Sequence, residues 1–203
     1  MNSELSTDKH KIGILGGTFN PIHLAHLELA KAAYEQYGLE KVLIMVSPNP
    51  PHKAGKVIAD VSHRNTMVKL AIEPYEYMEF SDFEQHRDGY IYTADTLTLL
   101  NELHPENQYY FIVGGDSIEC LDKWYHPEIV LDKCVLLAAG RDELFDQKLM
   151  TRINQLNEHY NSDIRPVKLK DMDISSTDVR AGQLEDVPVK VADYIREHHL
   201  YEV

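Results

Sequence analysis

Two histidines that follow a pair of glycines are the side chains best placed for chemistry near the start of the chain. They lie in the stretch Gly16-Gly17-Thr18-Phe19-Asn20-Pro21-Ile22-His23-Leu24-Ala25-His26. An apolar run at 12–15 precedes the glycines and a helical pattern follows them, so we expect a buried strand, a tight glycine turn and a helix. The amino end of a helix offers backbone N–H groups and the positive end of the helix dipole to a phosphate. His23 and His26 are three residues apart and share one helix face, which predicts a site that holds a triphosphate while it is cleaved.

Other interpretations of this stretch are weaker. Taken alone, Gly16 and Gly17 fit an ordinary turn between a strand and a helix, and the histidine pair fits a helix cap with one satisfied polar side chain. The dinucleotide-binding spacing G-x-G-x-x-G requires glycines at 18 and 21, where the chain has Thr18 and Pro21. A zinc site needs further cysteine or histidine ligands at short spacing, and the sequence shows no such motif. We therefore expect a phosphate site rather than a dehydrogenase or a zinc protein.

The composition narrows the classes of partner. The 203 residues carry a formal net charge of −13, and 43% of them are hydrophobic. An acidic chain disfavours nucleic acid and anionic membranes, so we expect neither as a partner. The sequence has no apolar run of about 18 residues, and its first ten residues lack the apolar core of a signal peptide. Two cysteines without a CxxC motif predict a reduced, cytoplasmic compartment.

Alternating apolar runs and helical patterns predict the architecture that positions these residues. We expect strands at 11–15, 42–46, 77–80, 108–113, 135–139 and 164–169, and helices at 22–37, 62–73, 93–103, 144–159, from 175 onward and at 187–198. This alternation predicts an α/β fold, a Rossmann-like parallel sheet with helices on both faces. We expect residues 1–10 to be a disordered lead-in and residues 11–203 to form a single domain. Ligands of such sheets lie beyond the carboxyl ends of the strands, where the unusual segments of this chain fall.

Two segments at opposite ends of the chain together indicate a family. The stretch 16–26 resembles the Gly-Gly-Thr-Phe-x-Pro-x-His-x-x-His signature of the nucleotidyltransferase superfamily, whose motif of the (H/T)xGH type is shared with class I aminoacyl-tRNA synthetases. The segment Ile174-Ser175-Ser176-Thr177-Asp178-Val179-Arg180 resembles the I-S-S-T-x-x-R helix start of the same enzymes. Segments between them resemble bacterial nicotinate-mononucleotide adenylyltransferases, namely Pro-Pro-His-Lys at 50–53, His63-Arg64 with Met67, 88–97, and Gly-Gly-Asp-Ser at 114–117 with Lys123-Trp124. The resemblance covers residues 11–202.

Two positions depart from the pattern of this family. Asn20 stands where the family usually has Asp, and Gly115 stands where Ala is common. Asparagine keeps the capacity for local hydrogen bonds and removes a negative charge near the phosphates. We therefore expect the activity to survive the change at position 20.

The resemblance implies transfer of the adenylyl group of ATP to nicotinate mononucleotide, which gives nicotinate adenine dinucleotide and pyrophosphate. It assigns catalysis to His23, His26 and Arg180, with Mg²⁺ carried by ATP and no metal ligand from the protein. The ATP site implied is Gly16, Gly17, Thr18, Phe19, His23, His26, Gly114, Asp116, Ser175, Ser176, Thr177 and Arg180. The acceptor site implied is Lys53, Tyr92, Thr93 and Trp124, with Trp124 stacked on the pyridine ring.

Several of these residues also have ordinary structural interpretations. A single tryptophan such as Trp124 is commonly a core or cluster aromatic, Asp116 fits a helix cap, and Tyr92 with Thr93 fits the start of a helix. Glu84 and Arg87 fit a solvated pair, and we expect no catalytic role for them. Three alternative functions stay open: an adenylyltransferase for nicotinamide mononucleotide or phosphopantetheine, a cytidylyltransferase for glycerol phosphate, and a nucleotide-binding sensor without turnover.

Overall fold

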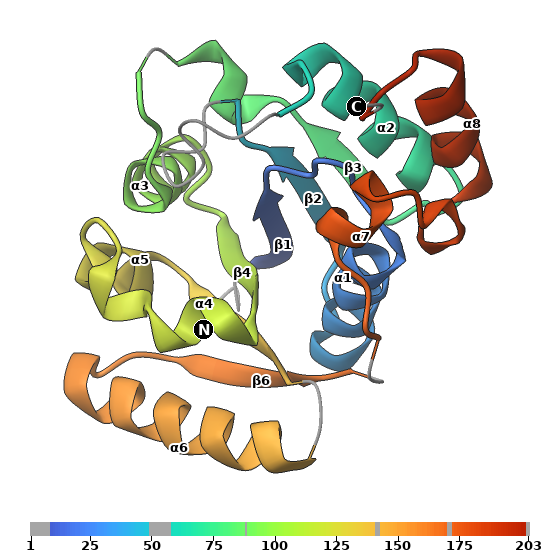
Figure 1. The fold of residues 1–203 in the computed structure, drawn as a ribbon. Coiled ribbons are helices and arrows are strands. Elements are labelled where there is room, and N and C mark those ends of the chain that lie inside the picture. The colour runs from blue at the N-terminus through green and yellow to red at the C-terminus, as the bar shows by residue number, and fades with distance from the viewer. Residues whose placement is uncertain (1–8, 49–57, 88, 141–142, 170–171, 202–203) are drawn as a thin grey trace.

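A single parallel sheet organises the chain. The computed structural model describes residues 9–48, 58–87, 89–140, 143–169 and 172–201. Six strands pair in the order β3-β2-β1-β4-β5-β6, and every neighbouring pair is parallel (Figure 1). The strands are β1 (His10–Gly17), β2 (Lys41–Val46), β3 (Met78–Ser81), β4 (Asn107–Gly114), β5 (Val135–Gly140) and β6 (Ile164–Lys168). The predicted strands are confirmed, with bounds that shift by one or two residues.

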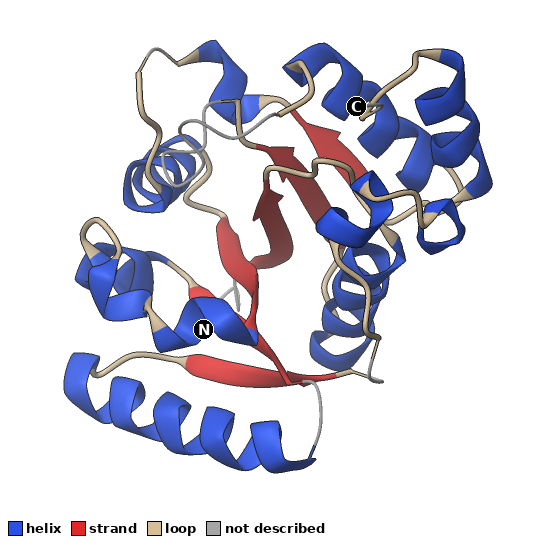
Figure 2. Cartoon of the chain, in the orientation of Figure 1, coloured by secondary structure: helices blue, strands red, loops and turns tan. Residues whose placement is uncertain are grey.

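Helices cover both faces of the sheet (Figure 2). They are α1 (Leu24–Tyr37), α2 (Val61–Ile72), α3 (Thr93–Leu103), α4 (Gly115–Glu119), α5 (Pro127–Lys133), α6 (Glu143–Tyr160), α7 (Ser176–Arg180) and α8 (Val189–Glu197). Side chains of α1, α2, α7 and α8 form one hydrophobic cluster with strand residues such as Val42, Ile44 and Leu137. Those of α3 to α6 form a second cluster with Ile14, Phe111 and Leu136. The Rossmann-like α/β prediction is therefore confirmed.

Some element boundaries differ from the sequence expectations for local reasons. Helix α2 begins at Val61 because Asp60, not Ser62, is its cap, and Asp60 Oδ1 accepts the Ser62 N–H at 2.8 Å. Helix α1 begins at Leu24, two residues later than expected. The short helices α4 and α5 were not predicted, and at five and seven residues they are too brief for a periodic pattern. The strand β1 already includes His10, which the sequence places in the lead-in.

Short 3₁₀ turns complete the described elements. They are η2 (Phe83–His86), η3 (Leu121–Lys123) and η4 (Leu184–Asp186). Within the described ranges, every helix is too short or too polar to cross a membrane.

Candidate active site

The strand order of the sheet reverses between β1 and β4, and we refer to the region beyond the carboxyl ends of the strands at this switch point as the crevice. The pairing of β1 with β2 continues to Gly17↔Val46, whereas its pairing with β4 ends at Leu15↔Ile112. The last two residues of β1 thus extend beyond the β4 ladder. In open α/β sheets this switch point is where ligands bind.

The two glycines belong to the strand rather than to the turn, which corrects the sequence expectation. Gly16 and Gly17 are the last residues of β1, and the turn is made by the residues that follow them. Phe19 adopts a φ of 46° and folds back, so a Cβ on Gly17 would lie 3.0 Å from the Phe19 ring. The turn continues through a cis Asn20–Pro21 bond. A side chain at position 17 would therefore press against the Phe19 ring.

The two histidines stack on each other at the start of α1. His23 is the N-cap residue and His26 the third helical residue, so only His26 lies within the helix as predicted. Their ring centroids are 3.7 Å apart, and His26 Nδ1 accepts the His23 backbone N–H at 3.2 Å. His26 also meets the Phe19 ring edge-on at 5.1 Å between centroids. The helix-cap interpretation of this pair is thus correct as a description of its local structure.

Burial makes His23 a neutral imidazole. The side chain is 6% exposed, and burial lowers its pKa from 6.5 to about 4. Its Nδ1 is buried without a hydrogen-bond partner among the described residues. A buried polar atom of this kind calls for an explanation, and a bound ligand is one. His23 therefore provides hydrogen bonding at pH 7 rather than positive charge.

The C-terminal signature segment lies directly against this turn (Figure 1). Ser176 Oγ donates to Pro21 O at 2.9 Å, and Arg180 Nη1 donates to Asn20 O at 2.7 Å. Arg180 Nη2 also reaches Thr177 Oγ1 at 3.1 Å. The structure therefore brings the guanidinium near the end of the chain onto the loop that carries the imidazoles.

Within this segment, Ser175 caps α7 and its Oγ accepts the Asp178 N–H at 3.2 Å. The hydroxyl of Ser175 also donates to the Asp178 carboxylate. Of the three hydroxyl residues predicted here to contact the phosphates of ATP, Ser175 thus uses its hydroxyl to cap α7.

The Asn20 side chain holds three segments together. It is 3% exposed, and its Oδ1 accepts the Ala59 N–H and the Tyr201 O–H, each at 3.0 Å. Both bonds need only an oxygen acceptor at position 20. The neutral amide of Asn20 therefore makes them without the negative charge that an Asp would bring.

Three of the predicted acceptor residues lie in described segments: Tyr92 and Thr93 at the start of α3, and Trp124 directly after η3. Tyr92 caps α3 and its ring stacks on Tyr125 at 4.3 Å between centroids. Trp124 is half-buried and meets Phe111 edge-on at 6.4 Å. Tyr125, which directly follows Trp124 in the chain, is a contact of Tyr92 that the sequence analysis did not predict.

The loop that ends β4 leads directly into α4. Gly114 is the last residue of β4 and caps α4, so Asp116 is exposed in the first turn and is not the cap. Gly115, one of the two departures from the family pattern, is buried there. Thr93 is the first residue of α3.

Two charged residues at this edge, Arg64 and Glu84, are buried. Arg64 is 1% exposed, and it donates only to backbone carbonyls in the bonds that involve described residues. Glu84 is 9% exposed and accepts two hydroxyl hydrogen bonds, so its interpretation as part of a solvated pair is wrong. The Nη1 of Arg87 is buried as well. The sequence alone indicated a solvent-exposed Glu84, whereas contacts with other elements bury it in the fold.

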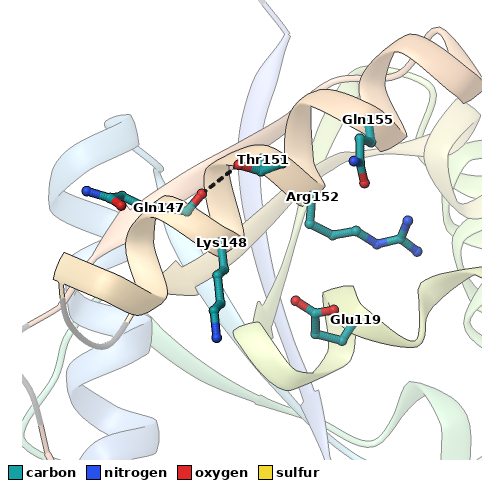
Figure 3. Close-up of a pocket in the computed structure, with 6 residues that line it drawn as sticks. All are labelled: Glu119, Gln147, Lys148, Thr151, Arg152 and Gln155. Carbon is teal, nitrogen blue, oxygen red and sulfur yellow. Dashed lines mark hydrogen bonds between the residues drawn. The ribbon is translucent and has the colours of Figure 1, made fainter.

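Lys53 and two cavities in the described part of the chain do not add to the candidate site. Lys53 falls outside the described residues. A cavity of about 460 Å³ lies between α4 and α6 (Figure 3) and is lined by Glu119, Gln147, Lys148, Thr151, Arg152 and Gln155. A second cavity, of about 450 Å³, reaches the amino ends of β1 and β4. Over the described part of the chain, neither lining includes a predicted site residue, so the candidate site remains the crevice.

Among the residues with described positions, no group of three or more His, Cys, Asp or Glu side chains is arranged to hold a metal ion. The parallel sheet, its strand order and the crevice define a Rossmann-like nucleotidyltransferase fold.

Comparisons with known proteins agree with the assignment of a nucleotidyltransferase fold. The cytidylyltransferase-like family matches residues 14–182. A curated protein of Lachnoclostridium phytofermentans named "Probable nicotinate-nucleotide adenylyltransferase" is 43% identical, over 94% of this chain and 98% of the relative. A Listeria monocytogenes protein of the same name is 38% identical, over 95% of this chain and 98% of the relative. The solved Plasmodium falciparum nicotinic acid mononucleotide adenylyltransferase complexed with NaAD has a similar fold, with a TM-score of 0.75 at 22% identity, over 94% of this chain and 97% of that one.

The chain therefore belongs to the cytidylyltransferase-like family, within the group of nicotinate-nucleotide adenylyltransferases.

Proposed function

We propose that the chain transfers the adenylyl group of ATP to nicotinate mononucleotide and releases nicotinate adenine dinucleotide and pyrophosphate, in NAD biosynthesis. The observation that carries this proposal is the contact of the two signature segments at the crevice, through Ser176 to Pro21 and Arg180 to Asn20. The curated relatives named for the activity support the choice of substrates.

The reaction needs positioning and charge stabilisation rather than a protein base. The 5′-phosphate of the acceptor is already an anion, so its oxygen attacks the α-phosphorus of ATP directly. A bond forms between that oxygen and the α-phosphorus, and the bond from the α-phosphorus to the bridging oxygen breaks in line. The electron pair leaves with pyrophosphate. Donors placed where negative charge develops are the main contribution that the protein makes.

His23, His26 and Arg180 are the proposed catalytic residues. With its lowered pKa, His23 is neutral at pH 7 and acts as a hydrogen-bond donor through one ring nitrogen. The positive charge that offsets the negative charge of the leaving pyrophosphate comes from the guanidinium of Arg180. The remaining contacts to ATP are assigned to Gly16, Gly17, Thr18, Phe19, Gly114, Asp116, Ser175, Ser176 and Thr177.

The acceptor is assigned to residues at the start of α3, after η3 and in the proline-rich loop. Trp124 stacks on the pyridine ring in this proposal. Tyr92 and Thr93 donate to the carboxylate. Lys53, from the proline-rich loop, contacts a phosphate.

A divalent metal ion enters with the nucleotide. Nucleotidyltransferases handle ATP together with such an ion, and we propose Mg²⁺. A magnesium ion prefers phosphate oxygens and water and needs few protein ligands, which fits the donor set of hydroxyls, imidazoles and a guanidinium at the crevice. When bound, it shields the charge of the phosphates.

The proposed setting is a reduced cytoplasm. Cys120 and Cys134 are both free thiols, as expected there. We propose no nucleic-acid or membrane partner for a chain of net charge −13.

A pyrophosphate-release assay tests the proposal. The purified chain is given ATP, Mg²⁺ and, in turn, nicotinate mononucleotide, nicotinamide mononucleotide and phosphopantetheine, and the products are identified by mass. We expect the highest turnover with the nicotinate substrate. His23→Asn keeps a good helix cap but removes the imidazole and should lower kcat by about 100-fold. His104→Asn is the matched control, because His104 is 53% exposed and lines the cavity at the amino ends of β1 and β4. If no pyrophosphate is released with any of the three acceptors, the proposal is refuted.

A further inference from the structure

Buried polar side chains are few and concentrated at the crevice. Among the described residues, the buried polar or charged ones are Thr18, Asn20, His23, Arg64, Glu84 and Thr96. Three of them belong to the turn between β1 and α1. The other three are on α2, on η2 and on α3, which surround the carboxyl ends of β1 and β2. Burial of a polar group is costly unless it is hydrogen-bonded, so the bonds of the last three are informative.

Arg64 joins three backbone segments. Its Nη1 donates to Thr18 O at 2.7 Å and to Ser47 O at 2.9 Å. Its Nη2 donates to Pro48 O at 3.1 Å and its Nε to Ala59 O at 3.0 Å. The planar, rigid fork of a guanidinium fixes its acceptors relative to one another. The turn after β1 is thus held to the residues after β2.

Glu84 continues the connection from Ser47 to α3. Ser47 Oγ donates to Glu84 Oε2 and Thr96 Oγ1 donates to Glu84 Oε1, both at 2.9 Å. Each carboxylate oxygen therefore receives one hydroxyl, and hydrogen bonds to a charged acceptor are among the stronger ones.

The connection ends at the start of α3. The backbone N–H of Thr96 donates to Tyr92 O at 3.1 Å. Thr96 itself is 1% exposed and belongs to the first turn after Thr93. Tyr92 and Thr93 are the residues that the proposed function assigns to the acceptor.

We propose that the path Thr18–Arg64–Ser47–Glu84–Thr96 is a positioning network that fixes the ATP half of the crevice relative to the acceptor half. This inference rests on the proposed function. In-line transfer requires the attacking oxygen and the α-phosphorus to approach within about 3–3.5 Å, and a misplacement of about 1 Å costs about 100-fold in rate. The two substrates are held by different elements, so a rigid link between those elements sets that distance. The network residues act through the loops they hold.

Two substitutions of Thr96 separate the hydrogen bond from packing. Thr96→Val keeps the shape of the side chain and removes the hydroxyl, whereas Thr96→Ser keeps the hydroxyl and removes a methyl group. The network predicts a kcat about tenfold lower for Thr96→Val and close to wild type for Thr96→Ser, with both KM values within about twofold. A packing role predicts the opposite order. Thr98→Val is the matched control on the same helix, because Thr98 Oγ1 donates only to Ala94 O, at 2.8 Å, among its described contacts.

Ser47→Ala tests the other end of the path. Ser47→Ala and Thr96→Val both cut the connection through Glu84, so the double variant should lose less kcat than the product of the two single losses. Thermal midpoints measured beside the kinetics show that each variant is folded at the assay temperature.

The outcomes distinguish this inference from the function on which it rests. If wild type turns over normally and Thr96→Val and Ser47→Ala keep kcat within about twofold, the network is only structural and the inference is overturned. If wild type releases no pyrophosphate with any acceptor, the proposed function fails and the inference falls with it. A kcat loss in Thr96→Val that Thr96→Ser restores supports the network.

Discussion

His23 should make the stability of the folded protein depend on pH in a predictable way. Burial lowers the pKa of this imidazole from 6.5 to about 4 in the folded protein. The unfolded chain therefore binds more protons than the folded one between these two values. It follows that the free energy of unfolding contributed by this residue is complete above pH 6.5 and falls as the pH falls toward 4.

The magnitude follows from the same two values. Between pH 7 and pH 5, the linkage relation with a folded pKa of about 4 gives a loss of about 2 kcal/mol from this one residue. That is a large fraction of the net stability of a domain, which is about 5–15 kcal/mol.

Urea denaturation at pH 7 and pH 5 measures the effect. Carboxylates and other histidines also titrate in this range, so the useful quantity is the difference between wild type and His23→Asn, in which their contributions cancel. We expect wild type to lose about 2 kcal/mol more than His23→Asn over this interval. His86→Asn is the control and should behave as wild type does, because His86 is 74% exposed. Parallel curves for wild type and His23→Asn would show that His23 is not held neutral by burial.

Three further substitutions test other parts of the structure. Arg180→Lys keeps the charge but loses the fork that reaches Asn20 O, so the KM for ATP should rise about tenfold in initial-rate measurements; an unchanged KM would contradict the assignment. Gly13→Ala places a Cβ 2.8 Å from Leu39 Cδ1, so urea denaturation should show a loss of about 1–3 kcal/mol; full stability would contradict the close packing. Trp124→Ala should raise the KM for the acceptor about tenfold and leave that for ATP unchanged; an equal rise in both would mean that Trp124 supports the crevice as a whole.

The sheet was predictable because each strand has a recognisable pattern in its own short segment of sequence. Buried parallel strands appear as continuous apolar runs, as in 42–46 and 135–139, and the structure has strands at both places. Helix α4 was not predictable in this way. Its five residues follow β4 without a break, and their helical state depends on packing against neighbouring elements.

The candidate site was predictable as a set of segments but not as a set of contacts. Strand order and the carboxyl-end rule place the two signature segments at one edge. The hydrogen bond from Ser176 Oγ to Pro21 O, however, is a contact across 155 residues that no local pattern encodes. The burial of Glu84 is of the same kind, since its two donors, Ser47 and Thr96, come from different elements. The low pKa of His23 likewise results from tertiary burial.

The order in which the crevice is assembled has a consequence for synthesis of the protein. Two of the hydrogen bonds that Asn20 accepts come from Arg180, 160 residues later, and from Tyr201, 181 residues later. A nascent chain on the ribosome therefore exposes its histidine turn long before the guanidinium that is proposed to hold pyrophosphate has been translated. On the proposed role of Arg180, adenylyl transfer begins only in molecules in which the segment that carries this residue has docked on the histidine turn, so catalytic competence reports that this docking has occurred.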